Sequence, residues 1–194
     1  MKKGLLIIIS GPSGVGKGTV RRKVMEDTSL NLAYSVSMTT RAPRKKEVDG
    51  VDYFFVSAAE FQRNIDEGGF LEWAEFVGNR YGTPKSYVEK LRNEGKNVIL
   101  EIEVEGAKQV LRQFPGDELT SIFLIPPSFE ELEARIRRRR SEPEAIIQER
   151  LNKARREMNL KYQYRFIVLN DDVDRAAAEI IDIIHSRINT VTYR

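Results

Sequence analysis

"GLLIIISGPSGVGKGT", residues 4–19, joins an apolar run to a glycine-rich loop. The run is typical of a strand that is buried on both faces of a parallel sheet. The loop fits the phosphate-binding pattern G-x-x-x-x-G-K-[ST] at Gly11, Gly16 and Lys17. Glycines let successive backbone N–H groups point at one oxyanion, and a following helix adds partial positive charge at its start. The stretch therefore predicts a strand, a phosphate site and a helix, in that order.

The hydroxyl group of this pattern is displaced by one residue. Gly18 follows the lysine, and the hydroxyl arrives as Thr19. The "GKGT" ending resembles the loop of nucleoside-monophosphate kinases, whereas GTPases are less favoured because the sequence contains no Asn-Lys-x-Asp guanine motif. A glycine-rich turn with an exposed lysine is the alternative. We interpret Gly18 as the mark of a subtype of phosphate loop.

Composition excludes several classes of site. Of the 194 residues, 41% are hydrophobic and 31% are charged, as in an ordinary globular protein. The net charge of +3 is too small to argue for or against a nucleic-acid partner, and we expect none. The sequence has no cysteine and a single histidine, His185, which argues against disulfides and against thiolate or histidine metal sites. The apolar run Leu5–Ile9 is too short for a signal peptide or a membrane span. We expect a cytoplasmic protein that does not bind membranes.

Apolar runs alternate with helical segments along the chain, which predicts an α/β fold with a parallel sheet between two helical layers. The expected strands are Leu5–Ile9, Asn97–Ile102, Thr120–Ile125 and Arg165–Leu169. The expected helices are Gly16–Asp27, Val104–Gln113, Phe129 to about Arg140, and Val173 to about Ile188.

Two segments interrupt this alternation. Residues 34–88 contain aromatic, glycine-punctuated stretches that predict a small α+β insertion of short strands and turns. Residues 126–155 form an excursion that is rich in arginine and glutamate. We expect a single domain over residues 4–185, whose core comprises residues 1–33, 89–125 and 156–194.

The first half of the insertion contains candidates for a second phosphate site. "YSVSMTTRAPRKKEVDGVDYFFV", residues 34–56, brings Arg41, Arg44 and Tyr53 within a short span. The planar fork of arginine donates two parallel hydrogen bonds to phosphate oxygens, so this set is a plausible clamp. Taken singly, the arginines have an equally good interpretation as solvated surface and the aromatic residues as core.

The second half of the insertion contains candidates for a base site. "GFLEWAEFVGNRYGTP", residues 69–84, includes Glu72, Tyr81 and Thr83. Guanine presents N–H donors that a buried Glu72 carboxylate accepts, and an O6 acceptor that meets the hydroxyl of Ser37 or Thr83. Adenine would leave the carboxylate unpaired, at about 1–3 kcal/mol or more.

Seven stretches, in order, resemble the guanylate kinase family over about residues 4–185. They are "SGPSGVGKGT", "SVSMTTRAPR", "EVDGVDYFF", "FLEWAEFVGNRYGTP", "ILEIEVEGA", "IPPS" and "LNDD". The resemblance implies phosphoryl transfer from ATP to GMP with Mg²⁺, on a P-loop core that carries a GMP-binding insertion (34–88) and a mobile lid (126–155). GMP is the expected acceptor, with dGMP a further substrate.

The resemblance also assigns roles by position. The residues assigned to GMP are Ser37, Arg41, Arg44, Tyr53, Glu72, Tyr81, Thr83, Glu101 and Glu103. The residues assigned to ATP are Gly11, Pro12, Ser13, Gly14, Val15, Gly16, Lys17, Gly18, Thr19 and Asn170. The catalytic set is Lys17, Arg41, Arg135, Arg139 and Arg150. Mg²⁺ is expected to be coordinated mainly by phosphate oxygens and water, with Thr19 as a weak protein contact.

The excursion "RIRRRRSEPEAIIQERLNKARRE", residues 135–157, has two other interpretations. Its arginines suit a solvated helix face paired with "FEELEAR", or an RNA-binding patch. Lid arginines of a kinase instead stabilise charge on the transferred phosphoryl group. Arg138 and Arg140 stand where the family usually has glycines, and Arg165 stands where it usually has aspartate.

Two alternative functions remain beside the kinase. A non-catalytic guanylate-kinase-like scaffold module is expected to lose the loop lysine or the clamp, yet Lys17, Arg41 and Arg44 are all present. An enzyme acting on AMP or dTMP conflicts with the carboxylate–hydroxyl set of Glu72, Ser37 and Thr83. Asp171 and Asp172 are candidates for capping the last helix. The sequence leaves a monomer and a homodimer equally open.

Overall fold

The computed structural model describes residues 2–76, 78–114, 118–138 and 143–192. Its core is a five-stranded sheet in the order β2-β7-β1-β8-β9, and every neighbouring pair of strands is parallel. The strands are β1 (Leu6–Ser10), β2 (Leu32–Tyr34), β7 (Asn97–Glu101), β8 (Leu119–Ile125) and β9 (Phe166–Leu169). The α/β class and the parallel sheet predicted from the sequence are confirmed.

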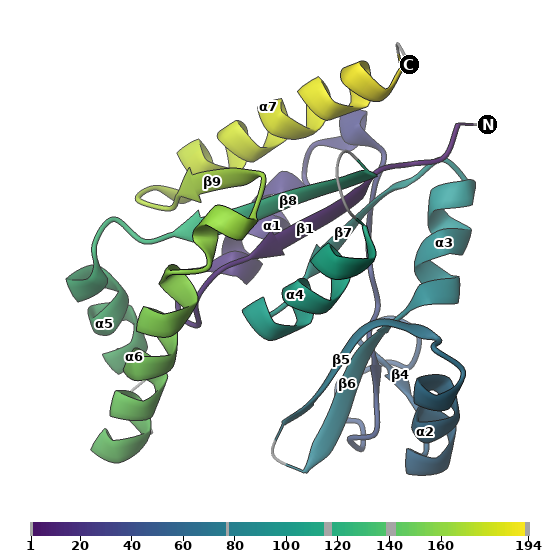
Figure 1. Ribbon diagram of the computed structural model, residues 1–194, viewed down its shortest axis with the longest axis horizontal. Helices are drawn as coiled ribbons and strands as arrows, with labels where there is room; N and C mark the ends of the chain where they lie inside the picture. Colours follow the sequence, from purple (N-terminus) through teal and green to yellow (C-terminus); the bar gives the residue numbers. More distant parts are fainter. Residues whose placement is uncertain (1, 77, 115–117, 139–142, 193–194) are drawn as a thin grey trace.

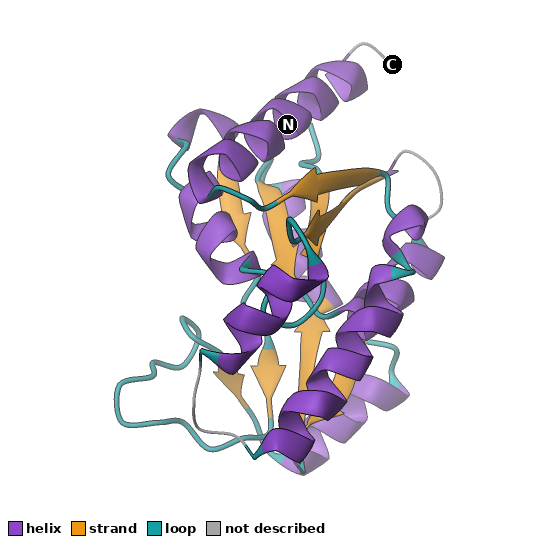
Figure 2. Ribbon diagram, turned by 90° about the vertical axis from the view of Figure 1, so that its left-hand side faces the viewer, coloured by secondary structure: helices purple, strands orange, loops and turns teal. Residues whose placement is uncertain are grey.

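The side chains of strand β1 pack into two hydrophobic cores, because successive side chains point to opposite faces of a sheet. Ile7 and Ile9 belong to the cluster that contains α1 (Lys17–Val24) and α7 (Val173–Thr192). Leu6 and Ile8 belong to the cluster that contains residues of α3 (Lys85–Asn93) and α4 (Val104–Gln113). Figure 2 shows helices on both sides of the sheet, which completes a three-layer α/β/α core.

The insertion forms a second sheet in the order β4-β3-β6-β5. Its strands are β3 (Met38–Thr39), β4 (Phe54–Phe55), β5 (Phe70–Phe76) and β6 (Asn79–Pro84), and α2 (Ala58–Asp66) packs against them through Phe61. The Gln109 side chain on α4 bonds both the N–H and the carbonyl of Trp73, at 3.2 and 2.9 Å. These bonds fix β5 to the core.

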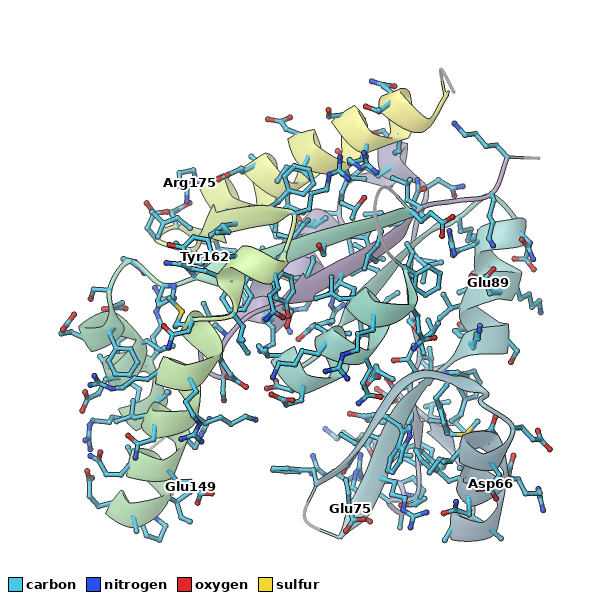
Figure 3. All side chains as sticks on the ribbon, viewed as in Figure 1. Asp66, Glu75, Glu89, Glu149, Tyr162 and Arg175 are labelled. Atoms are coloured by element: carbon cyan, nitrogen blue, oxygen red, sulfur yellow. The ribbon has the colours of Figure 1, made fainter. Side chains whose placement is uncertain are left out.

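The excursion forms two helices, α5 (Phe129–Arg137) and α6 (Glu144–Met158), of which α5 is capped by Ser128. The insertion and these helices extend from the same side of the core (Figure 1). In Figure 3, Glu149 on α6 and Glu75 on β5 lie near the far ends of the two projections. The remaining elements are the 3-10 turns η1 (Thr28–Leu30) and η3 (Lys161–Gln163).

Several expected ends shift by a few residues. Helix α1 begins at Lys17 because Gly16, at φ 99°, has a left-handed backbone that a helix cannot include, and α1 ends at Val24. Strand β2 was not predicted, and it pairs Tyr34, the first residue of the predicted insertion, with Ile99 of the core. Helix α3 crosses the predicted boundary at residue 88, and α6 extends past residue 155. No helix of the described ranges is long and apolar enough to cross a membrane.

Candidate functional site

The glycine loop lies between β1 and α1, at the carboxyl edge of the sheet. Asn170, at the end of β9, is buried, and its Nδ2 donates to the Val15 carbonyl at 2.7 Å. A Cβ atom at Gly16 would lie 2.7 Å from that same Nδ2. A side chain at position 16 would therefore collide with the amide that braces the loop. Contact between Asn170 and the adenine of ATP stays a prediction.

Lys17 is held inside the loop and is only 8% exposed. Its Nζ donates to the carbonyl oxygens of Gly11 at 2.8 Å and Pro12 at 3.4 Å. The same ammonium lies 3.2 Å from Oε1 of Glu103, the residue before α4. A positively charged group is thus fixed where the loop curls, as a phosphate site requires.

Two predicted lid arginines already contact the loop. Arg135 on α5 donates to the carbonyls of Val15 and Asn170, each at 3.3 Å. Arg150 on α6 donates from Nη2 to Ser13 Oγ at 3.1 Å. The prediction for Arg139 concerns a residue outside the described ranges. Arg135 also pairs with Glu131 at 3.0 Å, so part of the arginine–glutamate pairing considered as an alternative is present as well.

The predicted guanine readers lie together on the second sheet. Glu72 on β5 is directly opposite Thr83 on β6, and Thr83 Oγ1 donates to Glu72 Oε1 at 2.5 Å. Ser37 directly precedes β3, whose Met38 pairs with Gly82, the neighbour of Thr83. Burial raises the pKa of Glu72, which is 8% exposed, while the hydrogen bond from Thr83 lowers it. The result is a buried carboxylate that is hydrogen bonded to a hydroxyl group.

The predicted phosphate clamp is assembled around Arg41. The centre of its guanidinium lies 5.4 Å from the ring centroid of Tyr53, whose ring is 6.0 Å from that of Tyr81. Its Nη2 donates to Glu47 Oε1 at 2.8 Å, and the backbone N–H of Arg44 donates to Oε2 of the same carboxylate at 2.8 Å. The Arg44 side chain is exposed, so the structure does not bring it into the cluster around Arg41.

The two glutamates at the carboxyl end of β7 have different partners. Glu101, the last residue of the strand, pairs through Oε2 with Nε of Arg21 at 3.0 Å. Glu103 pairs with Lys17 and, at 3.8 Å, with Lys153 on α6. Among the described residues, no hydrogen bond or ion pair joins the side chain of Glu101 or Glu103 to Glu72. Direct contact of either glutamate with GMP stays a prediction.

A family model described as guanylate kinase matches residues 3–187. The chain belongs to the guanylate kinase family. It is 55% identical over 185 residues to the guanylate kinase of Mycoplasma mycoides subsp. mycoides SC, covering 95% of this chain and 62% of the relative. It is 51% identical over 187 residues to that of Malacoplasma penetrans, covering 96% and 95%.

A solved structure agrees with this assignment. The guanylate kinase of Anaplasma phagocytophilum superposes with a TM-score of 0.72 at 34% identity, covering 95% of this chain and 86% of that one. The chain spans only about 62% of the length of the Mycoplasma relative. Family and fold are therefore established for the matched residues.

This guanylate kinase family member also has site residues that the sequence analysis missed. Glu47 orients Arg41 through a hydrogen bond to its guanidinium. The sequence offered one indication of this residue, an acidic side chain three positions after Arg44, whose backbone N–H it also accepts from. Arg21 lies one turn after Lys17 on α1 and reaches Glu101. Only the helical spacing from Lys17 pointed to Arg21.

Proposed function

We propose that this chain transfers the γ-phosphoryl group of ATP to GMP, giving ADP and GDP. The observation that carries the proposal is the buried Glu72 carboxylate, hydrogen bonded to Thr83 in a domain whose core has a phosphate loop. A carboxylate suits the N–H donors of guanine and would be unpaired against adenine. Membership of the guanylate kinase family supports the same substrates.

In this proposal ATP binds the loop at residues 11–19 and Asn170, and GMP binds the insertion. Lys17 and the loop N–H groups hold the ATP phosphates, while Arg41, Tyr53 and Tyr81 hold the GMP phosphate. A GMP phosphate oxygen attacks the γ-phosphorus directly, so no protein nucleophile is needed. Catalysis is positioning plus neutralisation of charge spread over the equatorial oxygens.

The lid supplies the remaining charge. Arg135 and Arg150 contact the loop through carbonyl and hydroxyl oxygens, from which they would turn to the phosphates on nucleotide binding. Closure of residues 34–88 and 126–155 over the core would exclude water and strengthen these interactions. Arg44 would join the clamp during the same closure.

Mg²⁺ is compatible with the residues present. The described residues contain no group of three or more histidine, cysteine, aspartate or glutamate side chains that could hold a metal. This fits an ion bound mainly by phosphates and water, which is the usual arrangement for Mg²⁺ on nucleotides. Thr19 in the first turn of α1 would be the protein contact, and the ion would neutralise negative charge on the ATP phosphates.

A coupled assay tests this proposal. The full chain receives ATP and Mg²⁺ with GMP, dGMP, AMP, dTMP or UMP in turn, and ADP release is measured. We expect turnover with GMP and dGMP only. Lys17→Met should reduce kcat by about 10³-fold, while Lys23→Met, an exposed change on the same helix, should not. A preference for another acceptor, or no turnover at all, would refute the assignment.

A further inference from the structure

Arg21 and Glu101 form an ion pair that no role assigned above explains. Nε of Arg21 lies 3.0 Å from Oε2 of Glu101, and the two side chains are each 20% exposed. The pair joins the helix that follows the phosphate loop to the end of β7, across 80 positions of sequence. It therefore lies at the junction of the proposed ATP site with the strand that carries an acidic candidate for GMP.

The planar guanidinium of Arg21 lies over the ring of Tyr34. The centre of the guanidinium lies 4.2 Å from the centroid of the Tyr34 ring, a stacking distance at which the cation and the ring attract each other. Burial raises the pKa of the Tyr34 hydroxyl, so the ring is neutral at physiological pH. A stacked, planar donor leaves its partner carboxylate little freedom to rotate. Lysine could supply the charge at position 21 but not this plane.

Gly18 supplies the space that Glu101 occupies. A Cβ atom at position 18 would lie 3.2 Å from Oε1 and 3.7 Å from Oε2 of Glu101. Position 18 lies inside α1, where glycine is about 1 kcal/mol less favourable than alanine. The glycine that displaces the hydroxyl of the loop pattern thus permits a long acidic side chain to approach the loop.

Among the described residues, every side-chain hydrogen bond and ion pair of Glu101 uses Oε2. Oε1 faces Gly18 at the edge of the phosphate loop. A carboxylate oxygen held in this way is an acceptor for an O–H or N–H donor, such as a ribose hydroxyl or the exocyclic amine of a nucleotide. The Arg21 cation also offsets a negative charge that would otherwise repel phosphates beside the loop.

We propose that Arg21 is a positioning residue that, stacked on Tyr34 and given room by Gly18, aims the Glu101 carboxylate at a donor group of the acceptor nucleotide. The proposal deepens the function proposed above and rests on it for the identity of the acceptor. The packing relationship between Gly18 and Glu101 does not depend on that function. The two parts are tested separately.

Thermal unfolding of the ligand-free protein tests the packing. Gly18→Ala should lower the Tm by about 2–4 °C in the wild type, because Arg21 prevents the carboxylate from withdrawing. In a Glu101→Asp background the carboxylate is one methylene shorter, so Gly18→Ala should leave the Tm unchanged or raise it through better helix propensity. An equal change in both backgrounds would overturn the packing relationship.

Steady-state kinetics test the positioning role. Arg21→Gln should raise the KM for GMP about tenfold, equivalent to about 1.4 kcal/mol, with kcat and the KM for ATP within about twofold. Arg21→Lys should recover part of the loss, and Lys23→Gln on the same helix is the matched control. A KM for GMP within twofold of the wild type in a folded Arg21→Gln protein would overturn the proposal. Failure of the proposed function differs from this outcome, because the wild type itself would then not phosphorylate GMP.

Discussion

The Nζ atom of Lys17 lies 3.2 Å from Oε1 of Glu103, so the loop lysine has a carboxylate counter-ion in this structure. The other oxygen, Oε2, lies 3.8 Å from Nζ of Lys153 on α6. Glu103 is 55% exposed, and ion pairs with an exposed partner contribute little net free energy. If Lys17 binds an ATP phosphate as proposed, we expect the phosphate to displace this weak pair.

Glu103→Gln should tighten the binding of ATP in the absence of GMP by about 1.4- to fivefold, because it removes a competitor worth about 0.2–1 kcal/mol. Titration calorimetry at two salt concentrations measures the effect, which should shrink at the higher one. Glu105→Gln is the control, since Glu105 lies two residues after Glu103, in the first turn of α4, and pairs with Lys108 instead. Weaker binding of ATP to the Glu103 variant would mean that this carboxylate assists the nucleotide.

Arg41→Ala should raise the KM for GMP by at least about tenfold, the loss of one charge-assisted hydrogen bond of about 1.5–3 kcal/mol. The KM for ATP should not change. Arg80→Ala is the matched control, because Arg80 lies on the same small sheet and pairs with Gln62 and Glu75. If only the KM for ATP rises in the Arg41 variant, the clamp holds the other nucleotide.

The parts of the fold that depend on local pattern were predictable. The apolar run in β1 and the glycines after it are contiguous, so the central strand and the phosphate loop follow from residues 4–19. Strand β2 was missed because it has only three residues and owes its place to pairing with β7. Helix α2 had a signal in Ser57 and Glu60, since Ser57 Oγ accepts from the Glu60 N–H at 3.1 Å, but the surrounding aromatic residues obscured it.

The site was predictable only where residues act through sequence motifs. The motif that contains Glu72 and Thr83 predicted a shared role in binding guanine, which stays a prediction, and the structure shows that the two residues are cross-strand neighbours. The set of Arg21, Tyr34 and Glu101 has no sequence signature, because its members come from α1, β2 and β7 and meet only in the folded sheet. The reason for a glycine at position 18, which leaves space for the Glu101 carboxylate, is evident only when these contacts are known.

Glu72→Gln should weaken GMP binding and stabilise the free protein at the same time. Gln keeps an oxygen that accepts from Thr83, but it loses the charge that pairs with guanine donors, about 10–100-fold in affinity. Burial raises the pKa of Glu72, so between its usual value and its folded value the native state binds more protons than the unfolded state. The free energy of unfolding of the wild type therefore falls as pH rises through that window. The Gln variant has no ionisable group at this position, so its stability does not fall for this reason.

Calorimetry with GMP and thermal unfolding at pH 5 and pH 8 measure both effects of Glu72→Gln. Glu75→Gln, an exposed change on the same strand (Figure 3), should alter neither. An unchanged preference for GMP over AMP in the Glu72 variant would remove the residue from base recognition. A variant that is less stable than the wild type at pH 8 would contradict the assigned cause of the pKa shift.

Glu157 is a second buried carboxylate, and no ligand-binding role is assigned to it. It tests whether the burial of an ionised carboxylate lowers the free energy of unfolding at this position as well. It is 3% exposed on α6, and neither of its oxygens has a hydrogen bond among the described residues. Its described ion pair is with Lys153 at 3.6 Å. Burial raises its pKa, with Glu103 adding to the rise and Lys153 and Lys17 opposing it. Its ionised form is thus poorly compensated in the folded protein.

Glu157→Gln should therefore raise the Tm by about 2–4 °C at pH 7.5, about 1 kcal/mol, and by less at pH 4.5. The sign follows from the raised pKa: the wild type loses stability as pH rises from the usual glutamate value towards the folded one, and glutamine has no proton to lose. Lys153 is 46% exposed, so removing its partner leaves no buried cation. Glu149→Gln on the exposed face of the same helix should give equal Tm differences at both pH values. A Glu157 variant that is destabilised at pH 7.5 would instead mean that the carboxylate is compensated, and that the Lys153 pair outweighs its burial.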